Sequence, residues 1–264
     1  MNQKIINFYR VIGLIVLTIT FFNVKPTYAF NFTTNFTSTL TGDDAAKGDI
    51  WLNSIESEAG EVFNNFSLVT GGEIISNDIW TEEEVGASSA DKGDLATVGI
   101  QKENITDEDL TSVLGNLNLN SIIDTEDTGK SAINLFFDQA VDNLFFWERG
   151  LNSKLDIQAL DTEGNLIGNL FTLNSENWQY AGFDIDTLEI NSAQKVGSIG
   201  VSLADLGVQT PISGIRVTTL GEDYNGPDWK VVGSTASVPE SSSTLTLLGL
   251  GTIGLFGLRR RLVN

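Results

Sequence analysis

Apolar and polar residues alternate along most of residues 30–233, and this pattern predicts a series of β-strands. The stretch 30–39 alternates phenylalanine with polar residues, as a half-buried strand does. The stretches 131–137 and 141–147 are apolar on both faces, which is typical of central strands between two packed layers. The segments 154–160 and 166–173 flank a short turn and predict a β-hairpin. Further strands are expected at 49–55, 62–70, 183–190, 198–203, 215–219 and 229–232.

One α-helix is expected, from Thr106 to about Leu119. Thr106 and Asp109 have the spacing of a capping box, and three acidic residues at 107–109 favour a helix N-terminus. The apolar residues that follow recur at helical spacing and predict one face packed on a sheet. They are Leu110, Val113, Leu114 and Leu117.

Many short strands with turn signals between them predict a mainly β fold, an antiparallel β-sandwich of jelly-roll type with one short helix. A closed barrel is the main alternative. A turn is expected at 70–72 and a long polar loop at 77–90.

The N-terminus has the pattern of a secretory signal peptide, which we expect to form a helix within residues 1–29. Lys4 and Arg10 precede an apolar run of 12 residues, 11–22, and small residues end the segment. Cleavage is expected between Ala29 and Phe30. An uncleaved anchor is the alternative, although 12 apolar residues are few for a helix that spans a membrane.

The C-terminus combines a short apolar segment with a basic cluster. Residues 245–258 carry no charge and would form a helix of about 21 Å, against a hydrocarbon thickness of about 30 Å. Three arginines follow and are expected to stay on the cytoplasmic side. The predicted organisation is a signal peptide at 1–29, a β-sandwich domain at 30–233, a linker with a sorting motif at 234–244, and a transmembrane helix with its arginine cluster at 245–264.

This tail resembles the PEP-CTERM sorting signal, in which a Pro-Glu-Pro motif precedes a short transmembrane helix and an arginine cluster. Position 241 is serine where that motif has its second proline. The resemblance implies membrane insertion through the C-terminal helix, then processing by an exosortase and delivery to the cell surface. An ordinary C-terminal membrane anchor is the alternative. The matching positions are Pro239, Glu240, Arg259, Arg260 and Arg261.

The body of the chain also resembles a family, the cyanobacterial exosortase-dependent surface proteins. The stretches that carry this likeness are IIDTEDTG at 122–129, NLFFWERGLNSKLDIQALD at 143–161 and VGSIGVSLADLGV at 196–208. The resemblance implies a secreted domain at the outer surface or in the extracellular matrix of a biofilm. The export machinery, a processing exosortase and exopolysaccharide would be its partners.

Charge and composition narrow the chemistry further. The chain has 35 acidic and 15 basic residues and a net charge of −20, which disfavours nucleic acid as a partner. It has no histidine and no cysteine, which removes the usual zinc ligands and the Ser-His and Cys-His nucleophile pairs. Carboxylate chemistry and cations that prefer oxygen ligands remain.

Ca²⁺ is the candidate cofactor, and two acidic loops are its candidate sites. Residues 124–129 begin like a calcium-binding loop, but position 12 is Leu135 where an EF-hand needs glutamate, so an EF-hand is excluded. A looser calcium site and a solvated acidic loop are the alternatives there. The second loop precedes the last strand, where simple turn formation is the alternative. The candidate ligands are Asp124, Glu126 and Asp127 in the first loop and Asp223, Asn225 and Asp228 in the second.

Two further groups of residues carry weaker hypotheses. Trp178 and Tyr180, two apart on an expected strand, are candidates for stacking on sugar rings, with ordinary core packing as the alternative. Glu148 and Arg149 follow a hydrophobic strand and suit either a catalytic acid with its partner or a structural ion pair.

The sequence therefore predicts a sorted surface or extracellular-matrix protein with a structural or exopolysaccharide-associated role and no enzymatic activity. A carbohydrate-binding module with a defined glycan ligand is the first alternative. A secreted polysaccharide hydrolase is the second.

Overall fold

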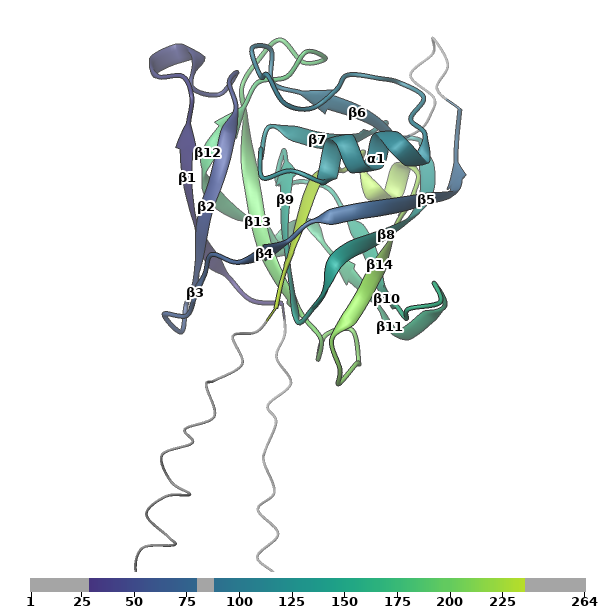
Figure 1. The fold of residues 1–264 in the computed structure, drawn as a ribbon. Coiled ribbons are helices and arrows are strands. Elements are labelled where there is room, and N and C mark those ends of the chain that lie inside the picture. Colours follow the sequence, from purple (N-terminus) through teal and green to yellow (C-terminus); the bar gives the residue numbers. More distant parts are fainter. Residues whose placement is uncertain (1–28, 80–87, 236–264) are drawn as a thin grey trace, which may run out of the picture.

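The computed structural model describes residues 29–79 and 88–235, which form layers of antiparallel β-strands and one α-helix (Figure 1). The prediction of a mainly β, antiparallel fold with one helix is confirmed. The expected signal and C-terminal helices lie outside the described residues, except Ala29. Within the described residues, no helix has the length and apolar character needed to cross a membrane.

The strands form three sheets. The first is three-stranded, in the order β1 (Phe32–Ser38), β2 (Ile50–Ser57), β3 (Val62–Phe63). The second is five-stranded, in the order β11 (Leu166–Leu173), β10 (Leu155–Leu160), β14 (Ile212–Leu220), β8 (Lys130–Val141), β5 (Val69–Asn77). The third is seven-stranded, in the order β12 (Gln179–Ile185), β13 (Gln194–Ser202), β9 (Asn143–Arg149), β15 (Asp228–Ser234), β7 (Ser121–Thr125), β6 (Ser88–Lys92), with β4 (Phe66–Ser67) also paired to β15.

The seven-stranded sheet lies between the other two and has an apolar cluster on each face. Alternate residues of β9 divide between the clusters: Leu144 and Phe146 pack with the five-stranded sheet and the helix. Phe145 and Trp147 pack with the three-stranded sheet. Because both faces of β9 are buried, its sequence is apolar without alternation, as expected for a central strand. The jelly-roll type of connection stays a prediction.

The helix α1 (Asp107–Leu114) begins as predicted but ends earlier. The carboxylate of Asp109 accepts hydrogen bonds from the backbone N–H and hydroxyl of Thr106, at 2.7 and 2.8 Å. At the other end, the carbonyl of Val113 accepts from the side chains of Asn116 and Lys230. These donors satisfy a carbonyl that a longer helix would have used, so Leu117 lies beyond the helix.

Two of the wrong local predictions concern β5 and β6. Residues 70–72 belong to β5 and are not a turn: a Cβ at Gly72 would lie 2.5 Å from a methyl carbon of Leu110 in α1, so glycine permits the close contact of strand and helix. Residues 88–90 were assigned to the loop at 77–90, but they belong to β6. The polar residues of β6 are buried and hydrogen-bonded, for example the Ser88 hydroxyl to Ser131 at 2.7 Å, so hydrophobic periodicity did not reveal this strand.

Both ends of the described body lie at the same end of the central strands. Phe30 exchanges two backbone hydrogen bonds of 2.8 Å with Gly200 in β13. Ser234, at the end of β15, is paired with Asn143 at the start of β9. Asn143 is also paired with Ser202, the end of β13. The N- and C-terminal connections therefore leave the body at one pole.

Candidate functional site: a charge cluster around Arg149

Four neighbouring strands bring charged residues together at the other end of the central sheet. Arg149 ends β9 and is paired with Asp228, the first residue of β15. Asp124 lies in β7 and Asp91 in β6, the next two strands in order. Six residues of β9 separate Arg149 from Asn143, or roughly 20 Å at about 3.3 Å per residue. The cluster is therefore at the pole opposite the two chain ends.

The guanidinium of Arg149 contacts three aspartates. Its Nε and Nη2 both lie close to Oδ2 of Asp228, at 2.8 and 2.7 Å. Nη2 also donates to Asp124 at 3.1 Å, and Nη1 lies 3.4 Å from Asp91. Nη1 also donates to the hydroxyl of Thr187. All five groups are buried, so the cluster is shielded from water and salt.

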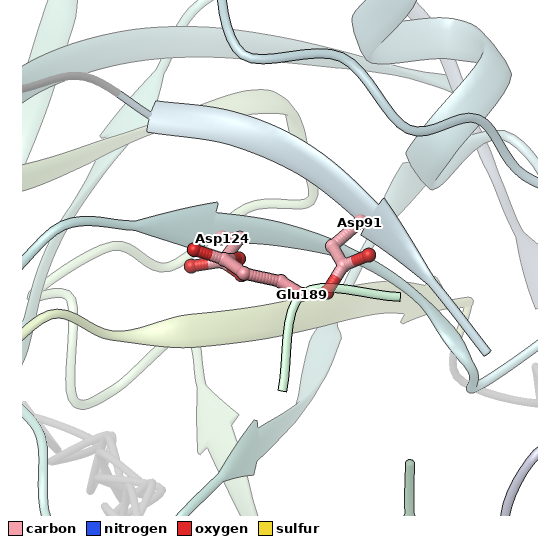
Figure 2. A group of neighbouring side chains, drawn as sticks. All are labelled: Asp91, Asp124 and Glu189. Carbon is pink, nitrogen blue, oxygen red and sulfur yellow. The ribbon is translucent and has the colours of Figure 1, made fainter. Parts of the chain in front are cut away.

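A loop after β12 brings a fourth carboxyl group to the cluster. Glu189 is exposed, yet its carboxyl is hydrogen-bonded to that of Asp124. Figure 2 shows these two carboxyl groups side by side, with Asp91 next to them. One oxygen from each of Asp91, Asp124 and Glu189 lies within 4.8 Å of the other two.

The carboxyl groups outnumber the guanidinium, and the pKa values respond. If all four acids were ionised, they would carry three more negative charges than Arg149 balances. The hydrogen bond to Asp124, together with the partial burial of the carboxyl end of this otherwise exposed residue, raises the pKa of Glu189 to about 9. Burial raises the pKa of Asp228 and of Asp91. For Asp124, the hydrogen bonds from Glu189 and Asp228 and the charge of Arg149 outweigh burial, so its pKa is lowered.

Excess negative charge in a buried site must be balanced by protons or by a cation. Carboxylate oxygens 4.8 Å or less apart suit a hard cation bound at 2.3–2.6 Å, as Ca²⁺ is. Asp91, Asp124 and Glu189 are the residues that could hold one. In the absence of a cation, the shared proton between Glu189 and Asp124 serves the same purpose.

The six predicted calcium ligands are only partly brought together. Asp124 and Asp228 meet at Arg149, and the backbone N–H of Thr125 donates to Asp228 at 3.3 Å. The two loops also touch: a Cβ at Gly226 would lie 2.7 Å from a carboxylate oxygen of Asp127. Only Asp124 of the six is in the group of metal-ligand geometry; the five others, Glu126, Asp127, Asp223, Asn225 and Asp228, are outside it. The backbone carbonyl of Asn225 accepts the Ser153 hydroxyl at 2.6 Å instead.

Glu148 and Arg149 do not form a pair with each other. Their side chains follow opposite faces of β9, and Glu148 is fully buried, with Oε2 accepting the backbone N–H of Leu151 at 2.7 Å. Burial raises the pKa of Glu148 to about 8. A carboxyl in this position holds the loop after β9 and does not reach a substrate at the surface.

The two candidate sugar-stacking residues have different environments. Trp178 lies before β12 and is 6% exposed in the apolar core, with its indole N–H donating to the carbonyl of Ser153 at 2.9 Å. Its ring is therefore not offered to a sugar. Tyr180 is 50% exposed on β12, and its hydroxyl donates to Asp184 at 2.9 Å.

Sequence reasoning missed Asp91 and Glu189 and the central role of Arg149. Asp91 was assigned to no element and Glu189 to the strand expected at 183–190, and neither has a neighbour along the sequence that belongs to the cluster. The one available signal was an arginine at the end of an apolar strand, which requires a carboxylate partner when buried.

Comparisons with known proteins add little to this geometry. No family model and no curated protein matches the chain. Among solved structures, the chain is similar to the catalytic unit of a thermostable GH87 alpha-1,3-glucanase from Streptomyces thermodiastaticus. The TM-score is 0.27 at 13% identity, over 45% of this chain and 21% of that chain. A likeness at this level does not indicate a shared fold or function.

Proposed function

We propose that this chain is an exported surface protein, sorted by an exosortase-type system, with a structural or exopolysaccharide-associated role and no enzymatic activity. The proposed targeting segments are the signal pattern at 1–29 and the PEP-CTERM-like tail. The sorting residues of this tail lie outside the described residues. A jelly-roll type of β-sandwich is part of the same proposal.

The observation that carries the proposal is the position of the two ends of the body. Phe30 is held on β13 by its backbone, and its ring contacts Phe145 at 6.0 Å between centroids. Cleavage after Ala29 would leave these contacts intact. β15 ends at Ser234, five residues before Pro239, so cleavage near the sorting motif would also spare the body. Both cuts would fall at one pole.

The same arrangement directs the opposite pole away from the membrane. With the tail inserted, the end of the central sheet that carries Asp91, Asp124 and Glu189 would point outward. A domain fixed at one pole suits display at a surface. The deep burial of Glu148 argues against this residue as a catalytic acid, because a catalytic acid must reach its substrate.

The intact mass of the protein from its native host tests the proposal. We expect a chain that begins at Phe30 and ends near Val238, at the cell surface or in the medium. Deleting the exosortase gene should leave the tail in place, and replacing Pro239 and Glu240 by alanine should do the same. A chain that keeps its tail in the wild-type host would show a permanent membrane anchor instead.

A further inference from the structure

The five-stranded sheet has one face in the core and one face directed outward. Figure 1 shows this sheet on the side of the body away from β1 and β2. Successive side chains of a strand point to opposite faces of a sheet. Asn134, Gln158 and Arg216 therefore face outward, because the residues on either side of each belong to the apolar core. These core residues are Ile133 and Leu135 in β8, Ile157 and Ala159 in β10, and Ile215 and Val217 in β14.

A row of polar side chains crosses this outward face. Arg216 in β14 is paired with Asn134 in β8 on one side and with Gln158 in β10 on the other. Glu73 in β5 is paired with Asn134. The row therefore runs across four neighbouring strands, at about 4.8 Å from one strand to the next. Glu73 is exposed, and Arg216 and Gln158 are half-buried.

Asn134 holds the guanidinium of Arg216 in one orientation. Its Oδ1 accepts a hydrogen bond from Nε of Arg216 at 2.8 Å, and its Nδ2 donates to Oε2 of Glu73 at 3.1 Å. Asn134 is 2% exposed, so its amide is satisfied by these two partners inside the row. Among the described residues, no hydrogen bond or ion pair engages the two terminal nitrogens of Arg216. A guanidinium that is fixed in advance loses little entropy when these nitrogens donate to a ligand.

An aromatic ring lies next to the row. Phe136 is two residues from Asn134 in β8, so it shares the outward face at about 7 Å along the strand. Its neighbours across the two adjacent strands are glycines, Gly71 in β5 and Gly214 in β14, so neither neighbour covers the half-buried ring with a side chain. A sugar ring packs its apolar face on an aromatic group, while its hydroxyls bond to polar side chains nearby.

The charges of the row favour a neutral ligand. Glu73 and Arg216 carry opposite charges, so an ionic ligand along the row would be attracted by one and repelled by the other. The exposed Glu163 adds to the repulsion of an anion, because it lies in the turn whose Gly164 approaches the Phe136 ring, at 3.7 Å from a Cβ position. A hydroxyl group both donates and accepts, so a neutral sugar can accept from Arg216 and donate to Glu73.

A peptide fits this face less well than a polysaccharide. A peptide that adds to a sheet pairs with the free backbone groups of an edge strand. β8, β14 and β10 are each paired on both sides, so their backbone groups are already used. Recognition on this face therefore depends on side chains alone.

We propose that this row binds a neutral polysaccharide, with a sugar ring on Phe136 and hydrogen bonds from the sugar hydroxyls to Arg216, Gln158 and Glu73. Asn134 is a positioning residue, because it acts through Arg216. The assignment deepens the exopolysaccharide part of the proposed function and rests on it for the biological setting. The binding itself does not depend on how the chain is sorted.

The test is an array of neutral, uronic-acid and amino-sugar oligosaccharides, probed with the full chain in detergent. We expect the neutral oligosaccharides to bind best. Arg216→Met and Gln158→Ala should each raise the dissociation constant about tenfold. Lys195→Met, which removes an exposed positive charge from β13, and Gln179→Ala, which removes an exposed amide from β12, are the matched controls and should bind like the wild type.

Melting temperatures separate binding from a purely structural role of the row. Arg216→Met leaves Oδ1 of the buried Asn134 without the Nε donor, so this variant should also melt at a lower temperature. Gln158 makes only a 3.5 Å hydrogen bond, to the carbonyl of Gly168. Gln158→Ala should therefore weaken binding at an unchanged melting temperature, which a structural role would not produce.

Four results would overturn the proposal: no neutral oligosaccharide binds, the charged oligosaccharides bind best, an extended peptide displaces the bound oligosaccharide, or Arg216→Met and Gln158→Ala both bind normally. The mass of the native protein is a separate measurement. A chain with both expected ends that binds no glycan would therefore overturn the binding row and leave the proposed sorting in place.

Discussion

Arg149 in β9 and Asp228 in β15 are paired across the two strands. One carboxylate oxygen of Asp228 lies 2.8 Å from Nε and 2.7 Å from Nη2 of the guanidinium. Both residues are buried. Two further aspartates share the same guanidinium. The stability of this end of the sheet therefore depends on one positively charged group, the guanidinium of Arg149.

Replacing Arg149 by methionine is expected to lower the free energy of unfolding by about 3–5 kcal/mol at pH 7, because the aspartates lose the charge that balances them. The loss should be smaller at pH 5, where protonation relieves part of their repulsion. Urea denaturation at the two pH values measures both effects.

Lys102→Met is the control for the loss of one positive charge. Lys102 pairs with Asp109 at 2.6 Å, but its side chain is 44% exposed. An exposed pair contributes about 1 kcal/mol or less. If the two variants lost equal stability, the burial of the Arg149 cluster would have no energetic consequence.

Glu148 should make the protein less stable as the pH rises. Its folded pKa of about 8 lies above the usual value of 4.5, so the folded chain keeps a proton that the unfolded chain releases between these values. Stability should fall by up to about 1.4 kcal/mol per pH unit from roughly pH 4.5 to 8. We expect Glu148→Gln, which resembles the protonated acid, to remove this part of the pH dependence.

Thermal denaturation of the wild type and of Glu148→Gln from pH 5 to 8.5 measures this difference. Glu163→Gln, which changes an exposed acid, should follow the wild-type curve. Parallel curves for all three proteins would show that Glu148 is ionised in the folded state.

Calcium is expected to raise the melting temperature of protein treated with chelator, by about 2 °C or more. The rise should be larger at pH 8 than at pH 6, because the cation must displace the proton that Glu189 holds with its pKa of about 9. Glu189→Gln should abolish the rise, whereas Glu222→Gln, outside the cluster, should keep it. A melting temperature that is the same with calcium and with chelator would contradict calcium binding.

Phe30 is expected to contribute to stability although it is the first residue after the proposed cleavage site. Its ring lies against Gly200, where a Cβ would come within 2.4 Å, and against Phe145. Phe30→Ala should cost about 2–3 kcal/mol, less than a fully buried phenylalanine because the residue is half-buried. Tyr180→Ala removes an exposed aromatic ring and serves as the control in the same denaturation series. It should lower the free energy of unfolding by about 0.5 kcal/mol.

Hydrophobic periodicity was sufficient to predict the strands whose residues alternate between buried and exposed or are buried throughout. β8, β9 and the β10–β11 hairpin were predicted to within a few residues. It failed for β6, which buries serines and an aspartate, and for the glycines of β5, which resemble a turn until the packing of Leu110 is known. In these two strands tertiary contacts decide the structure.

The candidate site was less predictable than the fold. Asp124 and Asp228 were recognised as loop acids, but their partner Arg149 comes from a third strand and Asp91 from a fourth. Register between strands distant in sequence places them together, and spacing along the chain does not contain that information. Likewise, β12 begins at Gln179, so Trp178 precedes the strand and turns into the core.

Both chain ends leave the body at the same pole, and this has a consequence for protein engineering. Phe30 and Ser234 are separated by the width of three strand pairs, so the ends are roughly 15 Å apart at about 4.8 Å per pair. A domain with neighbouring ends can be inserted into a surface loop of an unrelated host without forcing the loop open. Residues 30–235 would then act as a portable module, projecting its Arg149 end away from whatever carries it.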